Sequence, residues 1–322
     1  MIRIAVDAMG GDNAPIEIVK GVIEAASINN SIEITLVGNV ELLKEFELPS
    51  SGIKFHHADR VIGMNDSAVA RDIQSSISVG VNLVKSGAAD SFVSAGNTGA
   101  CMAQAVFGLK RIPGIIRPAI PTPIPVGDKY LYLIDAGANV DSKSEHLLQF
   151  AIMGSVYTKQ ILNIENPRVA ILSNGQEKKK GNKLTSETYD LLSDSSLNFV
   201  GYVEGNSMFY DHADVVVCDG FVGNIVLKVC EGIASSIIQM AGGELHANGI
   251  EKSIMEKVFM SLKKKMDYSE YGGAPLLGVN GNCVICHGSS LAKAIRNAIL
   301  HAAKMKEKNI NNIIQEEIGK YF

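Results

Sequence analysis

Residues 1–19 read MIRIAVDAMGGDNAPIEIV and contain a strand-like run, a glycine-rich turn and the start of a helix. Apolar side chains alternate along residues 2–6, as they do in a β-strand. Residues 12–15 supply the Asp, Asn and Pro that commonly begin a helix, and residues 18–26 keep apolar side chains at helical spacing. This stretch therefore predicts one strand–turn–helix unit.

The same unit recurs along the chain. Further apolar, β-rich runs occupy residues 34–37, 91–94, 130–134, 169–172, 199–200 and 215–217. Most of them precede a helical pattern, which predicts an α/β fold with a largely parallel sheet. Four prolines between residues 117 and 126 indicate either a crossing between two halves or an irregular edge strand.

Composition limits the classes of partner and compartment. The chain has 322 residues, of which 46% are hydrophobic, and a formal net charge of −4. This charge gives no overall field for nucleic acid, so we expect no nucleic-acid partner. We find no export signal and no run of 18 apolar residues, which predicts a cytoplasmic protein without a spanning helix. The five cysteines lie in apolar surroundings and are interpreted as reduced core residues.

Glycine-rich loops with Asn, Asp or Thr follow five of the predicted strands. The carboxyl ends of parallel strands meet at one edge of a sheet, so these loops can converge there. Each loop precedes a helix, whose first backbone N–H groups favour an anion. One such loop is commonly an ordinary turn, whereas five together favour a shared phosphate or carboxylate site. The loops span residues 10–12, 96–100, 135–139, 175–182 and 219–224.

Common cofactor motifs are missing from the sequence. It has no dinucleotide-binding, P-loop, zinc-protease or serine-hydrolase signature. Residues 283–287 read CVICH and fit a haem-attachment pattern, but the apolar run inside it favours a buried strand. No metal-ligand spacing occurs, so we expect neither a metal nor another cofactor.

Seven motifs, in order, resemble the phosphate acyltransferase family of bacterial lipid synthesis, over residues 2 to about 304. They are VDAMGGDNAP (6–15), SAGNTGA (94–100), DAGAN (135–139), KGN (180–182), DGFVGN (219–224), GGAP (272–275, preceded by Tyr268) and HGSS (287–290). The resemblance implies a three-layer α/β/α fold, like that of isocitrate and isopropylmalate dehydrogenases and phosphotransacetylases. We expect one domain over residues 1–322, with two lobes and a cleft between them as one arrangement.

The resemblance also implies a reaction. A long-chain acyl group would pass from acyl carrier protein to inorganic phosphate, in a homodimer held peripherally on the cytoplasmic face of an anionic membrane. The downstream acyl phosphate:glycerol-3-phosphate acyltransferase is a further candidate partner. The implied catalytic residues are Lys180 and Asn224. The candidate phosphate- and substrate-binding residues are Asp7, Gly10, Gly11, Asp12, Gly96, Asn97, Thr98, Gly99, Asp135, Asn139, Asn182, Asp219, His287 and Ser289.

Each catalytic candidate also has a structural interpretation. Lys180 suits charge compensation at a carbonyl oxygen, but the run 178–180 is also typical of a solvated loop, and Lys179 remains an alternative. Asn224 can donate to phosphate or cap the following helix. His287 can orient phosphate, transfer a proton or serve structure alone.

Residues 251–268 predict a projecting amphipathic helix with a basic side. Val258, Phe259 and Leu262 are the candidate membrane contacts, although a core-facing surface helix has the same pattern. The segment 64–76 departs from the family in being short and weakly basic. Three rival functions stay open: a dehydrogenase of the related fold, a coenzyme A-dependent phosphate acetyl- or butyryltransferase, and a catalytically silent membrane adaptor for acyl carrier protein.

Overall fold

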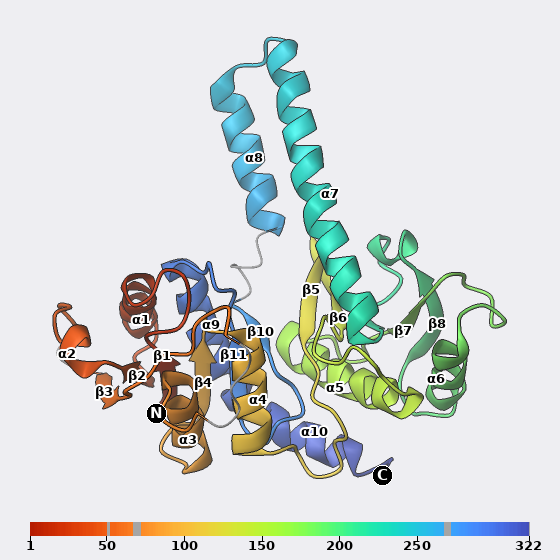
Figure 1. Cartoon of the computed structure of the whole chain (residues 1–322). Coiled ribbons are helices and arrows are strands. Elements are labelled where there is room, and N and C mark those ends of the chain that lie inside the picture. The colour runs from red at the N-terminus through yellow and green to blue at the C-terminus, as the bar shows by residue number, and fades with distance from the viewer. Residues whose placement is uncertain (50–51, 67–71, 267–271, 322) are drawn as a thin grey trace.

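The computed structural model describes residues 1–49, 52–66, 72–266 and 272–321. Within them, strands form two sheets flanked by helices (Figure 1). The first sheet has the order β10–β11–β4–β1–β2–β3, and only β10 runs antiparallel to its neighbour. Its strands are β1 (Ile2–Asp7), β2 (Ile32–Gly38), β3 (Ile53–His57), β4 (Ser91–Ser94), β10 (Ala274–Pro275) and β11 (Asn282–Ile285).

The second sheet has the order β5–β6–β9–β7–β8, and only β5 is antiparallel. Its strands are β5 (Pro121–Val126), β6 (Lys129–Ile134), β7 (Val169–Ser173), β8 (Phe199–Glu204) and β9 (Val215–Val217). The proline-rich stretch is therefore the edge strand β5, where prolines remove few ladder hydrogen bonds. The α/β prediction is confirmed, but its largely parallel sheet is divided into two.

Helices cover both faces of the first sheet, because successive side chains of each strand point to opposite faces and both faces carry apolar side chains. Ile4 and Val6 of β1 join the same buried cluster as α1 and α9, while Ala5 joins the cluster of α3 and α4. The first cluster continues without a break into the second sheet through α5 and α10, so the two sheets share one core. These helices are α1 (Ile16–Ile28), α3 (Ser76–Lys85), α4 (Thr98–Leu109), α5 (Ser144–Leu162), α9 (Ala292–Glu307) and α10 (Ile310–Ile318).

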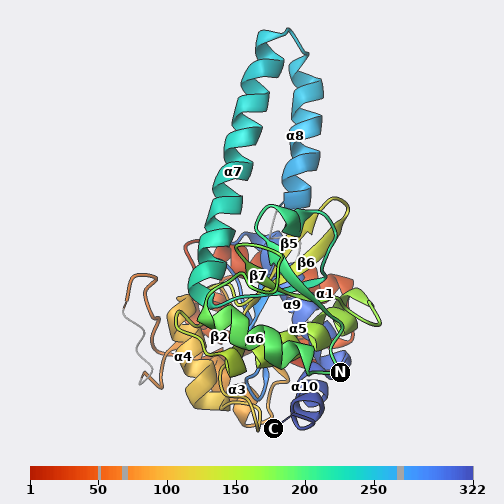
Figure 2. The ribbon, with the colours of Figure 1, turned by 90° about the vertical axis from the view of Figure 1, so that its right-hand side faces the viewer.

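Two further helices stand away from the body in both views (Figures 1 and 2). They are α7 (Gly220–Ala247) and α8 (Lys252–Met266), and they contact each other where Phe259 lies against Gly242. By length and composition alone α7 is able to cross a bilayer, and only 6% of its most apolar window is buried. The sequence criterion, a run of 18 apolar residues, did not select α7 because Lys228 and Glu231 interrupt its apolar run. The remaining elements are α2 (Val40–Leu43), α6 (Lys183–Ser193) and the 3-10 turn η1 (Ser207–Phe209).

All five cysteines are free, and four of them are buried. Cys283 and Cys286 lie on or beside β11 inside the core, as the core interpretation of the CVICH run predicts. The side chains of residues 252 and 261–266 and all of residues 267–271 lie outside the described part of the chain. The predicted contact Leu262, the motif residue Tyr268 and the end of the predicted 251–268 helix fall there.

Candidate active site

The candidate residues lie beyond the carboxyl ends of two groups of neighbouring strands. In the first sheet, β11, β4 and β1 are adjacent, and we call the residues that follow them the first loop set (8–15, 95–99 and 286–291). In the second sheet, β6, β9 and β7 are adjacent, and the residues that follow them form the second loop set (135–143, 218–224 and 174–182). Ala138 of the second set packs against the buried cluster that includes Ala100 and Cys101 of α4. The two sets are therefore neighbours.

Asp7, at the end of β1, links two strands of the first sheet beneath the first loop set. Its carboxylate is 1% exposed and accepts hydrogen bonds from the amides of Met9 and Gly10, both at 3.1 Å. It also accepts a hydrogen bond from Ser94 Oγ at 2.7 Å, from the neighbouring strand β4. Burial raises the pKa of the Asp7 carboxyl, and these hydrogen bonds offset only part of that effect. Asp7 was predicted as a substrate contact, but this burial gives it an indirect position beneath the loops.

The loops after β1, β4 and β11 touch one another through their backbones. A Cβ on Gly10 would lie 2.7 Å from Gly96 Cα, so only glycine allows this approach. The Asp12 amide donates to the Gly288 carbonyl at 2.8 Å, and Asn13 Nδ2 donates to the Ser289 carbonyl at 3.2 Å. The exposed Asp12 carboxylate would repel phosphate, whereas its amide fixes the loop.

Neutral donors remain at the surface of the first loop set. Asn97 caps α4 by accepting from the Ala100 amide at 2.9 Å, and its Nδ2 group donates to the carbonyls of residues 63, 64 and 66. Asn97 is thereby occupied in holding structure. Thr98 and Gly99 are exposed at the start of α4, and within the described residues their amides have no acceptor. Such a helix start attracts an anion.

His287 adds a side chain to these donors. Its Nδ1 lies 2.8 Å from Ser289 Oγ and accepts from the Ser289 amide at 3.2 Å, and both residues are exposed. The neighbouring Ser290 is 4% exposed, and its hydroxyl has no hydrogen-bond partner in the described structure. Sequence reasoning did not nominate Ser290 or Ser94, although both lie inside quoted motifs.

The second loop set is built around Asp135, which is fully buried. Its carboxylate accepts from the amides of Ile120, Ala138 and Asn139, and from Asn139 Nδ2 at 2.8 Å. Burial raises the pKa of this carboxyl as well. The Asn139 carbonyl accepts from the Gly220 amide at 2.7 Å, which joins this loop to the start of α7. Asp135 and Asn139 therefore position the loop and α7.

Asn224 lies on the exposed side of this junction. Asp219 caps α7 by accepting from the Val222 amide at 2.9 Å, so Asn224 is one residue beyond the capped turn and does not cap the helix itself. A Cβ on Gly137 would lie 3.7 Å from Asn224 Cβ, which places Asn224 over the loop after β6. Its side-chain amide makes no hydrogen bond to any described residue, and it is exposed. Asn224 is thus available to a ligand.

Lys180 follows the neighbouring strand β7. Its amide donates to the Glu177 carbonyl at 2.8 Å, and its side-chain stem lies against Gly175. Among the described residues, neither Lys179 nor Lys180 forms an ion pair, whereas Lys178 lies 3.5 Å from Asp190 and over the Tyr189 ring. Asn182 caps α6 through the Thr185 amide.

The two catalytic candidates come from adjacent strands without touching. Within the described part of the chain, no hydrogen bond joins Lys180 to Asn224. Substrate atoms would therefore have to bridge them. No group of three or more His, Cys, Asp or Glu residues able to hold a metal occurs among the residues searched.

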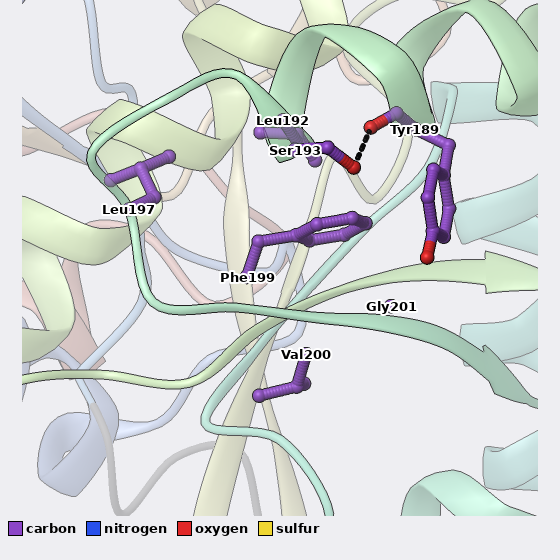
Figure 3. A pocket seen from close by; sticks show the side chains of 7 residues that line it. All are labelled: Tyr189, Leu192, Ser193, Leu197, Phe199, Val200 and Gly201. Carbon is purple, nitrogen blue, oxygen red and sulfur yellow. Dashed lines mark hydrogen bonds between the residues drawn. The ribbon is translucent and has the colours of Figure 1, made fainter.

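Two surface hollows lie elsewhere. One of about 380 Å³ lies between α6 and β8, where the rings of Phe199 and Tyr189 meet edge to face (Figure 3). Another of about 230 Å³ includes Gln176 and His212. Neither hollow is lined by Lys180 or Asn224, so the candidate site does not coincide with either hollow.

The fold defines the class of protein. A phosphotransacetylase from Streptococcus pyogenes superimposes with a TM-score of 0.66 at 17% identity, over 95% of this chain and 94% of that chain. A 4-hydroxythreonine-4-phosphate dehydrogenase from Klebsiella pneumoniae gives 0.54 at 12% identity, over 95% and 98%. The chain therefore has the phosphotransacetylase fold, as the sequence predicted.

Its relatives define the family. The family model described as "Fatty acid synthesis protein" matches residues 2–313. The phosphate acyltransferase of Geobacter sulfurreducens is 47% identical, over 100% of this chain and 95% of that protein. That of Desulfitobacterium hafniense is 49% identical, over 99% and 98%. The chain belongs to the phosphate acyltransferase family and is a transferase of acyl groups in fatty acid synthesis.

Proposed function

We propose that this phosphate acyltransferase takes a long-chain acyl group from acyl carrier protein and delivers it to inorganic phosphate. The observation that carries the proposal is the meeting of two loop sets with different chemistry. The first offers neutral donors at the start of α4, and the second offers Lys180 and Asn224 from adjacent strands. An anion and a polarised carbonyl both have suitable partners there.

In the proposed reaction, a phosphate oxygen attacks the thioester carbonyl carbon. The carbonyl oxygen becomes negative, and Lys180 and Asn224 compensate that charge. The carbon–sulfur bond then breaks, and the thiolate of the carrier leaves and takes up a proton. Phosphate is partly dianionic at neutral pH and thiolate leaves readily, so the protein mainly supplies position and charge.

The long acyl chain has an apolar path beside Asn224. Phe221, Ile225, Val229, Ile233 and Ile237 of α7 follow one another at spacings of four residues and are 46–56% exposed. Side chains four residues apart are neighbours on a helix, so these five form one continuous apolar face that turns slowly around α7. We propose that this face serves the acyl chain and the contact between two subunits of a homodimer. Sedimentation of the wild type as a monomer would contradict the dimer.

We also propose peripheral attachment to the cytoplasmic face of an anionic membrane through α8. Ile254, Val258 and Met260 are 53%, 46% and 64% exposed, while Phe259 is half-buried against α7 and is the weaker contact. Short amphipathic helices bind reversibly, and a dimer would present two. The acyl phosphate would reach the downstream acyltransferase at that surface.

A liposome experiment tests this attachment. The Ile254→Glu/Val258→Glu variant should lose most of its co-sedimentation with vesicles containing anionic lipid, while acyl transfer in solution persists. Val200→Glu is the matched control, because Val200 is also 46% exposed but lies on β8. Equal binding of both variants would reject α8 as the anchor.

A coenzyme A thioester is the second candidate donor, because phosphotransacetylases share the fold. The two donors are compared directly. Purified protein is incubated with phosphate and either palmitoyl carrier protein or palmitoyl coenzyme A, and acyl phosphate is trapped with hydroxylamine. We expect faster trapping from the carrier thioester, strict dependence on phosphate and no loss with EDTA.

Each other outcome selects a rival. Faster reaction from coenzyme A would favour the phosphotransacetylase-like donor. Carrier binding without any acyl phosphate would favour a silent adaptor. Loss of activity with EDTA and its rescue by Mg²⁺ would contradict a metal-independent mechanism.

A further inference from the structure

Two neighbouring strands of the first sheet are joined at their carboxyl ends by a buried hydrogen-bond relay. The Gly96 amide donates to Ser94 Oγ at 3.0 Å, and Ser94 Oγ donates to Asp7 Oδ2 at 2.7 Å. Asp7 Oδ1 accepts from the amides of Met9 and Gly10. One carboxylate thus fixes three amides in two loops that are 87 residues apart in the chain.

This relay buries a carboxylate, which has a free-energy cost that joining two strands does not require. Asp7 and Ser94 are each 1% exposed, and no cation pairs with Asp7 anywhere in the described residues. Burying a carboxylate without a cation has a desolvation cost that hydrogen bonds only partly offset. The same strands are already clamped at their other ends, where Arg3 donates to Asp90 at 3.1 Å. Joining β1 to β4 therefore does not by itself explain the relay.

The relay ends where the exposed amides begin. Gly96 comes directly before Asn97, the residue that caps α4, and Thr98 and Gly99 follow as the first two residues of that helix. Asp12, two residues beyond Gly10, bonds to the loop that carries His287 and Ser289. A shift of the Gly10–Gly96 contact would therefore displace donors from three loops at once. Displacements of about 1 Å are enough to reduce the efficiency of a bound reactant by about 10²-fold.

We propose that Asp7 and Ser94 are positioning residues for phosphate, which hold the loops after β1, β4 and β11 in register around one anion. This inference rests on the proposed function and assigns phosphate to the first loop set, leaving the thioester carbonyl to Lys180 and Asn224. Neither Asp7 nor Ser94 touches substrate. Their effect is on affinity for phosphate, through the amides of Thr98 and Gly99.

The test measures phosphate affinity in two ways. Ser94→Ala and Asp7→Asn are titrated with inorganic phosphate by calorimetry, and KM values for phosphate and for the acyl thioester are measured separately. We expect the phosphate Kd and KM to rise about 10-fold in each variant, the size of effect that loss of about one hydrogen bond to a charged group would have, while the KM for the thioester changes less than two-fold. Asp90→Asn is the matched control, because it breaks the clamp between the same strands at the opposite edge.

The outcomes separate positioning from mere stability. If Ser94→Ala melts at a lower temperature but binds phosphate as tightly as the wild type, as Asp90→Asn should, the inference is overturned. If Asp7→Asn does not fold, Ser94→Ala decides alone, since it leaves the carboxylate and its two amide contacts in place. If the wild type binds phosphate but forms no acyl phosphate, the proposed function fails while this inference is still decided by the calorimetry.

Discussion

The two ends of the parallel strands use aspartate in opposite ways. At the carboxyl ends, Asp7 and Asp135 are buried, and burial raises the pKa of both carboxyls. At the amino ends, burial would also raise the pKa of Asp90, but hydrogen bonds from Arg3 and the charges of Arg3 and Lys306 lower it to about 2. Hydrogen bonds from Lys129 and Arg168 lower the pKa of Asp211 to about 2.

The pKa values of the aspartates differ between the two ends of the strands because the groups that contact each carboxylate differ. Arg3–Asp90 spans β1 and β4, and Arg168–Asp214 spans β7 and β9, so each sheet has a cationic clamp at its amino edge. At the carboxyl edge the carboxylates accept from amides and a hydroxyl instead. The ion pairs at the amino edge thus stabilise the fold. The buried carboxylates at the carboxyl edge have a free-energy cost, but they fix the geometry of the loops.

The largest effect should come from the carboxyl edge of the second sheet. Lys180→Ala and Asn224→Ala should each lower kcat by about 10²-fold or more, because a positioned charge or donor at the carbonyl oxygen is lost. Both side chains are exposed, so the melting temperature should change little. Acyl phosphate formation and thermal unfolding are the measurements.

The lysine run contains its own controls. Lys178→Ala should keep near wild-type turnover, since Lys178 already pairs with Asp190 and covers Tyr189. Inactivity of Lys179→Ala, with an active Lys180→Ala, would move the assignment by one residue. Activity in all three would remove the lysine run from the mechanism.

The amino edge should respond in stability alone. Asp90→Asn should lower the free energy of unfolding by about 2 kcal/mol at neutral pH, since each unit of pKa shift corresponds to about 1.4 kcal/mol. The Asp90 side chain is only 14% exposed, so solvent screening is limited. Urea unfolding measures the change. Turnover reduced by more than about two-fold would break the division between the two edges.

The pH dependence of this contribution has a definite sign. A carboxyl whose pKa is lower in the folded state than the usual 3.8 stabilises the fold above that value. The gap in unfolding free energy between wild type and Asp90→Asn should therefore be complete above about pH 5 and shrink as the pH falls toward 2. A gap that stays constant from pH 7 to pH 3 would show that the charge of Asp90 is not its cause.

Local sequence signals predicted most of the strands and the loops that follow them, but they missed β3 and offered Asn224 as the cap of α7, which starts at Gly220. Asn97, Asn182 and Asp219 each precede a helix and each caps it. The sequence also predicted these three side chains to bind substrate, and a side chain that caps a helix has less hydrogen-bonding capacity left for a ligand. At Asn224 the structure distinguishes a helix cap from a ligand-binding side chain, because the side chain is exposed and Asp219 caps the helix instead. The exposure of a side chain cannot be inferred from the neighbouring residues in the sequence.

Contacts between distant segments were not accessible to local reasoning. β11 enters the first sheet beside β4 nearly 200 residues later, and the proline-rich β5 pairs antiparallel with β6 in the second sheet. The division into two sheets depends on these pairings. The Asp7–Ser94 contact is equally non-local, so the only signals at Ser94 were its place at the end of a buried strand and its position in the SAGNTGA motif. The family resemblance nominated loops at the carboxyl ends of neighbouring strands, but it gave none of the hydrogen bonds between them.

The smallest effect should come from Asp211, and it sharpens the comparison most. Its pKa is lowered to about 2, like that of Asp90, yet its side chain is 45% exposed against 14%. Water and salt screen an exposed pair, and ordering two long side chains offsets part of the attraction. Asp211→Asn should therefore lower the free energy of unfolding by no more than about 0.5 kcal/mol, and 0.5 M NaCl should abolish the difference. The same denaturant titration at low and high salt measures both variants. A loss as large as that of Asp90→Asn would mean that Arg168 and Lys129 hold Asp211 as a rigid network, and that burial is not what ranks the clamps at the amino edge.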